Sequence, residues 1–178
     1  MIKKTLLLLF FITAISVHSQ EWTQNKEQTK VSFKIKNFGV NVDGDFSDVK
    51  IETNFNPDNL SQSYINANIA VKSITTGIES RDKSLLKEDY FDVENHKNIV
   101  LKSTKIEKKP DGSFTLLADL TIKGKTKQLE IPLTVSNTNS ELRINAKFTI
   151  NRKDFKVGGG SFIMSKNVKV EVVYSGTK

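Results

Sequence analysis

Side chains able to carry out catalysis are scarce in this 178-residue sequence. It contains no cysteine, and His96 is the single histidine beyond residue 19. A Ser-His-Asp triad or a zinc site would therefore have to be built around His96. That histidine lies in a charged segment beside Lys97, without a nucleophile-elbow motif. We expect His96 to be a surface residue and predict no enzyme, no metal site and no cofactor; a hydrolase dependent on His96 is the weakest alternative.

Two acidic groups and one glycine run resemble functional motifs only in part. Asp43-Gly44-Asp45 with Asp48 lacks the ligand spacing and the distal glutamate of a calcium loop, so a hairpin turn is the better interpretation. The carboxylates between Glu88 and Glu94 are expected to be solvated rather than an acid-base pair. Gly158-Gly159-Gly160 has no following Lys-Ser/Thr, so it predicts a flexible loop and not a phosphate loop.

The first 19 residues have the pattern of a cleaved signal peptide. Lys3 and Lys4 precede a short apolar run, and Val17-His18-Ser19 offers small residues where a signal peptidase reads. The apolar run is short for a spanning helix, which makes a retained N-terminal anchor the weaker alternative. We predict cleavage near Ser19-Gln20, one domain over residues 20–178, and a periplasmic or secreted protein without disulfides.

The basic charge of the chain is dispersed. Loss of Lys3 and Lys4 with the leader lowers the formal net charge from +7 to +5. The remaining lysines mostly alternate with apolar residues, as on solvated strand faces and protected sheet edges. No basic patch interleaved with aromatic residues is present, so we expect no nucleic-acid partner. Weak, transient attraction to a membrane surface with anionic headgroups stays open, and the pattern fixes no oligomeric state.

The clearest structural signal is the hairpin over residues 114–135. Apolar residues alternate from Phe114 to Ile122 and again from Leu129 to Val135, so both strands have one apolar face. A two-residue turn at Gly124-Lys125 would set Leu120 opposite Leu129. A second turn at Thr138-Asn139 extends the same face through Phe148.

Alternation also predicts strands in most of the remaining chain. They cover 31–35, 38–46, 49–55, 65–71, 98–106, where the phase is mixed, and 168–174. The charged segment after Ile74 lacks alternation, and Ser80 could cap a short helix from Arg81 to Glu88. The result is an antiparallel all-β fold of about eight strands with one short helix near residues 80–91. Pattern alone does not separate a barrel from a sandwich.

The inward-facing residues of these strands carry no charge. One interpretation is an ordinary packed core, which physics alone favours. The other is a cavity for a long apolar ligand, since an eight-stranded barrel is near the size that holds one small molecule.

Several motifs resemble the YceI-like family of secreted polyisoprenoid-binding proteins across nearly all of residues 20–178. The matching pieces, in order, are Val31-x-Phe33-x-Ile35 with Phe38-Gly39, Gly44-x-Phe46, Ser73-Ile74-Thr75-Thr76, Arg81-Asp82-x-x-Leu85, Asp89-Tyr90-Phe91-Asp92-Val93, Asp119-Leu120-Thr121-Ile122-Lys123-Gly124 with Thr126-Lys127, and Asn151-Arg152-Lys153-Asp154-Phe155. Asn95-His96-Lys97 departs from the pattern, because relatives commonly have an aromatic residue followed by proline there.

The resemblance implies a lipocalin-like barrel that holds a long isoprenoid chain, such as that of a quinone, with the 81–91 segment near one end. Its ligand-binding candidates are the apolar lumen residues Phe33, Ile35, Phe38, Phe46, Ile69, Leu85, Phe91, Phe114, Leu116, Leu120, Ile131, Leu133, Phe148, Ile150 and Phe155. Arg81 is the candidate for contact with a polar head group.

These observations lead to one main hypothesis and one rival. The main hypothesis is a periplasmic lipid-binding protein that carries or sequesters a polyisoprenoid-type molecule without forming bonds to it. The rival is a structural or protein-interaction module with a filled core.

Overall fold

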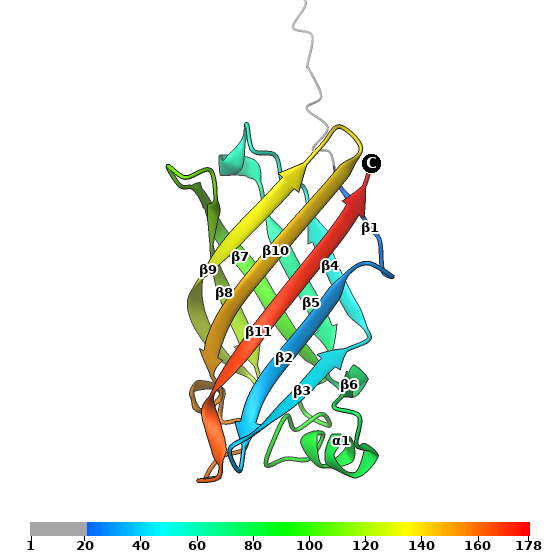
Figure 1. Cartoon of the computed structure of the whole chain (residues 1–178), viewed down its shortest axis with the longest axis vertical. Coiled ribbons are helices and arrows are strands. Elements are labelled where there is room, and N and C mark those ends of the chain that lie inside the picture. Colours follow the sequence, from blue (N-terminus) through cyan, green and yellow to red (C-terminus); the bar gives the residue numbers. More distant parts are fainter. Residues whose placement is uncertain (1–20) are drawn as a thin grey trace, which may run out of the picture.

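One antiparallel sheet of eleven strands forms the wall of the protein (Figure 1). The computed structural model describes residues 21–178, so the predicted signal peptide lies outside the described residues. In chain order the elements are β1 (Thr23–Gln24), β2 (Lys30–Asn37), β3 (Val40–Phe46), β4 (Val49–Thr53), η1 (Leu60–Gln62), β5 (Ile65–Ala70), η2 (Val71–Ser73), β6 (Ile74–Thr75), α1 (Glu79–Leu85), β7 (Asn98–Lys108), β8 (Phe114–Ile122), β9 (Lys125–Asn137), β10 (Glu141–Asn151), η3 (Arg152–Phe155) and β11 (Met164–Thr177).

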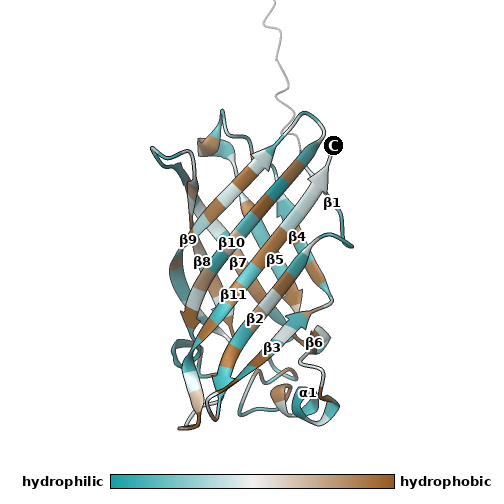
Figure 2. Cartoon of the chain, in the orientation of Figure 1, coloured by the Kyte–Doolittle hydropathy of each residue, from teal (hydrophilic) through white to brown (hydrophobic). Residues whose placement is uncertain are grey.

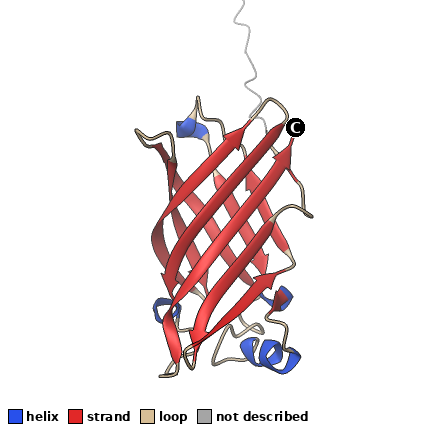
Figure 3. Cartoon of the chain, viewed as in Figure 1, coloured by secondary structure: helices blue, strands red, loops and turns tan. Residues whose placement is uncertain are grey.

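The all-β prediction is confirmed, with more strands than the eight expected. Two of the additional strands, β1 and β6, have two residues each, which is too short to produce an alternating pattern. The strands form the long walls, and the helical segments lie at the ends (Figure 3). Along each strand hydrophobic and hydrophilic residues alternate (Figure 2). Within the described residues, no helix is long and apolar enough to cross a membrane.

A bent strand curls the sheet into a barrel. β3 pairs with β2, whereas β4, only two residues further along, pairs with β5. The chain at Ser47–Asp48 therefore passes from one edge of the sheet to the other. The amide of Ser47 donates to the carbonyl of Ser73 at 3.2 Å, and the carbonyl of Asp48 accepts from Ala70 at 3.0 Å. These bonds hold the bend on both sides, so the two edges meet.

The upper part of the seam depends on a side chain. β1 pairs with the end of β11, and Trp22 donates its amide to the carbonyl of Thr53 at 3.0 Å. The amide group of Gln24 donates to Val49 at 2.9 Å and accepts from Ile51 at 2.7 Å. Gln24 thus satisfies the exposed edge of β4 in the way that a neighbouring peptide group would.

The two predicted hairpins are present, but both expected registers are wrong by two residues. In the first, Leu120 lies opposite Lys127 and Ile122 opposite Lys125, so the turn is Lys123-Gly124. Both turn residues have positive φ, 48° and 67°, as a type I′ turn requires. In the second, Asn137 pairs with Leu142, which leaves a four-residue loop. A slip of two residues keeps every side chain on its predicted face.

The β2–β3 connection also differs from the prediction. Asn37 pairs with Val40 across a two-residue turn at Phe38-Gly39, and both turn residues have positive φ. The acidic Asp43-Gly44-Asp45 run therefore lies within β3 and is not a hairpin turn. Gly44 faces inward beneath Phe33: a Cβ at this position would lie 2.3 Å from Cζ of that ring. The glycine is required by close packing and not by a turn.

The structure explains one irregular strand and corrects the predicted cap of the helix. The mixed phase of residues 98–106 reflects a bulge in β7, where the register with β8 shifts between Ser103 and Lys105. The predicted helix exists as α1, but its expected N-cap is wrong. Ser80 lies inside the first turn, and the capping position is occupied by Ile78, which makes no side-chain capping bond.

The two ends of the barrel differ. The upper end of Figure 1 is the end with the C-terminus, where β11 finishes beside β1. Trp22 precedes β1, Phe55 follows β4, Phe114 begins β8 and Tyr174 lies near the end of β11, and each is at most 6% exposed. The rings of Phe55 and Phe114 meet edge to face with centroids 5.2 Å apart. This aromatic plug closes the upper end. The lower end is covered by α1, the residues that follow it and the 152–163 loop.

Candidate ligand-binding lumen

An apolar cavity of about 150 Å³ lies inside the barrel. None of its lining side chains is charged, and only Ser32 and Tyr174 carry a polar group. The lining comprises Val31, Ser32, Phe33, Phe46, Ile51, Ile65, Ala67, Ile69, Ile99, Leu101, Leu116, Leu120, Ile122, Ile131, Leu133, Ile144, Ala146, Phe148, Ile150, Val168, Val170, Val172 and Tyr174. Every long strand contributes, because alternation places every second residue inside the barrel.

Nine of the fifteen predicted lumen residues line this cavity. They are Phe33, Phe46, Ile69, Leu116, Leu120, Ile131, Leu133, Phe148 and Ile150. The lining residues that sequence reasoning did not select lie mainly on β5, β7 and β11. The alternating Val168, Val170, Val172 and Tyr174 gave a readable signal for β11, whereas the bulge hid the phase of β7.

The other six predicted residues lie elsewhere. Phe38 is 72% exposed, so the expectation that it faces inward is wrong: it is the first residue of the tight turn and is out of phase with Val31 and Phe33, which line the lumen. Phe114 belongs to the upper plug, and Phe155, at the end of η3, is 1% exposed and packs in the hydrophobic core outside the cavity lining. The half-buried Ile35, Leu85 and Phe91 lie outside the lining.

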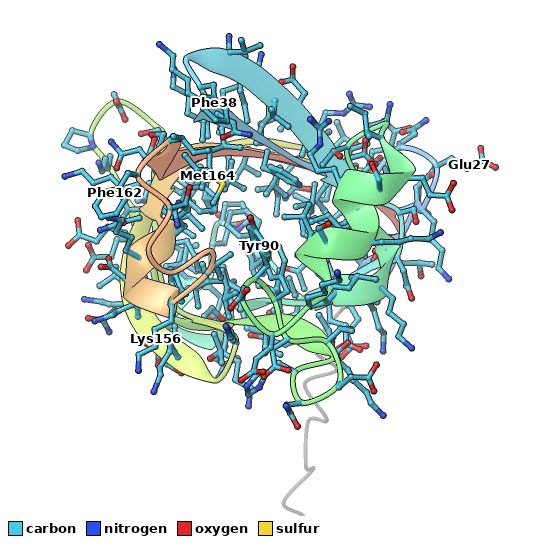
Figure 4. The ribbon with its side chains drawn as sticks, turned by 90° about the horizontal axis from the view of Figure 1, so that it is seen from below. Glu27, Phe38, Tyr90, Lys156, Phe162 and Met164 are labelled. Atoms are coloured by element: carbon cyan, nitrogen blue, oxygen red, sulfur yellow. The ribbon has the colours of Figure 1, made fainter. Side chains whose placement is uncertain are left out.

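A series of aromatic rings leads from the lumen to the lower cap. The Phe33 and Phe46 ring centroids are 5.8 Å apart, and those of Phe46 and Phe91 are 6.5 Å apart in an edge-on arrangement. Tyr90, next in the chain to Phe91, lies near the centre of the barrel when it is seen from below (Figure 4). All four residues are only partly buried. The lower end is therefore closed more loosely than the upper end.

Arg81 and Asp82 fix the position of α1. Arg81 donates from Nε and Nη2 to the hydroxyl and carbonyl of Thr76, both at 2.7 Å. Asp82 accepts from the amide of Thr76 at 2.9 Å and from its hydroxyl. Two separated sequence motifs thus meet at Thr76 and tie α1 to the end of β6.

Arg152 organises the loop that follows β10, a role that sequence reasoning missed. Its side chain is buried, with the residue 3% exposed. Nε donates to Ser165, Nη1 to Val157 and Gly158, and Nη2 to Ser161 and Met164, all backbone carbonyls within 3.1 Å. A guanidinium has five N–H groups, so every donor of Arg152 is used by the loop and the first two residues of β11, and none is free for a ligand. Burial lowers the pKa of Arg152 from its ordinary value.

A family model for the YceI-like domain matches residues 22–175. The chain belongs to the YceI-like family. The match begins at Trp22 of the upper plug and ends at Ser175, so it covers the whole barrel. The motifs that carried the resemblance lie mostly at the lower end, in the β2–β3 turn, the 73–93 segment, the β8–β9 turn and the start of the 152–163 loop.

Relatives and solved structures agree with this assignment. A UPF0312 protein of Vibrio cholerae is 25% identical over 136 residues, 72% of each chain. One of Pseudomonas syringae is 25% identical over 100% of this chain and 99% of the relative. The structure of BcnA from Burkholderia cenocepacia superimposes with a TM-score of 0.81 at 23% identity, covering 85% of this chain and 98% of that one. A polyisoprenoid-binding domain from Saccharophagus degradans gives 0.70 at 12% identity, over 88% and 97%. These structural likenesses concern the fold.

Other candidate sites in this YceI-like protein are less convincing. His96 packs over the β8–β9 turn, where a Cβ on Gly124 would lie 2.9 Å from its Cε1, and its Nε2 is 3.8 Å from an Asp92 carboxylate oxygen. In residues 21–178, no group of three or more His, Asp or Glu side chains could hold a metal ion.

A larger hollow of about 840 Å³ is a groove lined mainly by polar side chains of β2, β3, β10 and β11. Four of its six charged side chains form two ion pairs, Lys34 with Asp43 at 3.0 Å and Lys147 with Glu171 at 2.9 Å. The other two, Asp45 and Lys169, carry opposite charges, so the lining of the groove is neutral as a whole and does not select an anionic or a cationic ligand. The apolar lumen is therefore the candidate site.

Proposed function

We propose that this YceI-like protein binds a long apolar lipid of the polyisoprenoid or isoprenoid-quinone type in its lumen, and carries or sequesters it outside the cytoplasm. The observation that carries the proposal is a cavity lined by side chains from nearly every strand without a single charge. Such a lining favours hydrocarbon, and its two hydroxyl groups, those of Ser32 and Tyr174, donate to the backbone carbonyls of Glu171 and Trp22. The proposed role is therefore binding without bond formation.

The energetics favour a long chain over a short one. Each buried CH₂ contributes roughly 0.8 kcal/mol, whereas association costs on the order of 4–15 kcal/mol in lost freedom. Several prenyl units must be buried before binding becomes favourable. Arg81 near the lower end would meet a polar head group through Nη1, since its Nε and Nη2 are engaged by Thr76.

A long ligand requires the lumen to widen. A dry cavity of about 150 Å³ accommodates a molecule of the size of benzene, and ligand pockets usually measure about 300–1,000 Å³. Phe33, Phe46 and Phe148 line the lumen and are only partly buried. Rotation of these rings toward the lower end would open a continuous channel. The small volume is also the observation that favours the rival function, an interaction module with a filled core.

The test combines lipid extraction with a variant that fills the lumen. Ala146 lines the cavity and is 6% exposed, so Ala146→Phe places a phenyl ring in a space of about that size. We expect prenyl lipid in organic extracts of the purified wild-type protein, detected by mass spectrometry, and uptake of a prenyl quinone by the stripped protein. Ala146→Phe should abolish both while the protein stays folded.

Thr134→Phe is the matched control, because Thr134 is exposed on the outer face of the neighbouring β9. It adds the same ring without touching the lumen and should bind as the wild type does. Absence of co-purified lipid together with no quinone uptake by the wild type would leave the interaction module as the function.

A further inference from the structure

All five large hydrophobic side chains that are exposed in the described part of the chain lie at the lower end of the barrel. Phe38 lies in the β2–β3 turn and Val40 begins β3, Phe162 and Ile163 belong to the loop before β11, and Ile78 precedes α1. Phe162 is 100% exposed and Phe38 is 72% exposed. Both stand at the rim in the view from below (Figure 4). Scattered exposed apolar residues are ordinary, but their confinement to one end is not.

Four of these residues lie on two adjoining loop tips, and we call them the rim patch: Phe38, Val40, Phe162 and Ile163. The amide of Phe38 donates to the carbonyl of Ile163 at 3.0 Å, and Asn37 pairs with Met164 in the sheet. The β2–β3 turn and the 152–163 loop are thereby joined at their tips. The patch is a single structure built from two loops.

The loop that carries Phe162 is held in place. The five bonds from Arg152 tie the carbonyls of Val157, Gly158, Ser161, Met164 and Ser165 to one buried guanidinium. Residues 162 and 163 lie between two of these anchor points. Their side chains are therefore presented to solvent by a fixed backbone and do not fold back onto the barrel.

The charges beside the rim patch are mainly basic. Segments 36–41 and 152–166 contain the exposed lysines Lys36, Lys153, Lys156 and Lys166 and one carboxylate, Asp154. Asp154 is hydrogen-bonded by Asn151 at 3.1 Å. Across the lower end, the 79–94 segment carries six carboxylates and three basic side chains. The 79–94 and 152–166 segments meet where the amide of Gly158 donates to the carbonyl of Asp89 at 2.8 Å, and the exposed Phe38 and Phe162 belong to the basic segments.

We propose that the rim patch docks this protein on the surface of a bilayer that contains anionic phospholipid. Aromatic tips enter the headgroup region while the flanking lysines meet the anionic headgroups, as in other interfacial proteins. Four side chains on two loop tips are too few for the roughly 800 Å² per partner of a stable protein interface, whereas they suit shallow insertion. Because the charge is one-sided, the barrel docks tilted toward the β2–β3 turn. Docking goes beyond lipid binding in the lumen and does not require it.

Vesicle sedimentation tests the proposal with protein recovered after expression of the full-length sequence. Vesicles of phosphatidylethanolamine and phosphatidylglycerol are compared with vesicles of phosphatidylcholine at physiological salt. We expect binding to the anionic vesicles only, and at least a tenfold weaker partition for Phe38→Ser combined with Phe162→Ser. Both positions are exposed, so the variant should melt as the wild type does.

A charge pair provides the matched control. Lys36→Gln with Lys166→Gln should weaken binding, whereas Lys108→Gln with Lys109→Gln, an equal change of charge at the upper end, should not. Equal effects of the two pairs, or unchanged binding of the Phe38 and Phe162 variant, would overturn the proposal. So would a concentration-dependent dimer that this variant abolishes while vesicle binding is absent. Lipid extraction is scored separately, so an empty lumen with intact vesicle binding would reject only the luminal ligand.

Discussion

At Gly44 the ring of Phe33 occupies the space that a side chain would need. A Cβ there would lie 2.3 Å from Cζ of Phe33 and 2.8 Å from the carbonyl oxygen of Thr75. The ring can rotate, but the backbone oxygen cannot move freely. We therefore expect Gly44→Ala to destabilise the protein by about 1–3 kcal/mol, measured by urea unfolding.

A double-mutant cycle identifies the cause. Leucine at position 33 lacks Cζ, so Phe33→Leu should reduce the cost of Gly44→Ala without removing it, because the contact with Thr75 remains. The coupling energy should fall in the range of about 0.5–3 kcal/mol that is typical of residues in contact. Strictly additive effects would contradict the proposed contact.

Tyr174 makes stability depend on pH in the alkaline range. Burial raises the pKa of Tyr174 to about 12, and its hydroxyl donates to the carbonyl of Trp22 at 3.4 Å. Below pH 10 the side chain is neutral whether the protein is folded or not. Between pH 10 and about 12 the unfolded chain ionises first, so stability falls by roughly 2–3 kcal/mol in total.

Tyr174→Phe should flatten this part of the stability curve, as measured by urea unfolding at pH 8 to 11.5. The hydrogen bond of Tyr64 to Glu21 also raises the pKa of that tyrosine to about 12. Tyr64 is present in the wild type and in Tyr174→Phe, so its ionisation contributes equally to both stability curves. The difference between the curves therefore reports the ionisation of Tyr174. Identical alkaline slopes would show that Tyr174 titrates normally.

At the scale of elements, the seam beside β4 depends on the amide group of Gln24. Its nitrogen donates to Val49 and its oxygen accepts from Ile51. Gln24→Glu keeps the acceptor and replaces the donor with a second acceptor that faces a carbonyl. We expect a loss of about 1–3 kcal/mol at pH 7, with a smaller loss at pH values low enough to protonate the carboxylate.

Gln28→Glu is a close control for this change. The side-chain oxygen of Gln28 accepts from Ser175 at 3.0 Å and from Arg143 at 3.5 Å. Both bonds use the oxygen as an acceptor, and a carboxylate oxygen can replace it. This variant should be nearly neutral in thermal melts; an equal loss for both variants would show that the donor to Val49 is unimportant.

The elements that sequence predicted well are those whose signal is local. Alternation assigned faces correctly from Phe114 to Phe148 even though both registers were off by two, because parity survives such a slip. The first register failed because Lys123, a non-glycine residue, adopts the left-handed conformation of the turn, and the second failed because the loop between Asn137 and Leu142 has four residues and not two. The structural role of Arg152 was also missed. Its acceptors are backbone carbonyls, which leave no trace in residue identity.

At the scale of the molecule, neither the closure of the barrel nor its internal cavity could be predicted from the sequence pattern. The bend at Ser47–Asp48 shifts the inward positions from even numbers in β3 to odd numbers in β4, a change of phase that does not tell which strand becomes the new pairing partner. The cavity depends on how side chains from opposite walls meet, which is a property of packed volume and not of any one strand. The family resemblance predicted the barrel, whereas only the structure shows that the two ends of the barrel differ.

That difference predicts which end a ligand uses. Phe55 is 2% exposed in the upper plug and contacts Phe114 edge to face. Phe91 is half-buried at the lower end and packs edge-on against Phe46. Phe55→Ala should therefore cost about 3–5 kcal/mol of stability, and Phe91→Ala should cost less because its environment is already partly solvated.

For the rate of ligand release, Phe91→Ala should have the larger effect and Phe55→Ala the smaller. The release of a bound prenyl quinone to acceptor vesicles should accelerate in Phe91→Ala, because the ring stands between Phe46 of the lumen and the lower surface. Phe55→Ala, assayed under conditions in which it remains folded, should release at the wild-type rate. Faster release from Phe55→Ala alone would place the exit at the upper end, far from the rim patch, and would separate the luminal ligand from membrane docking.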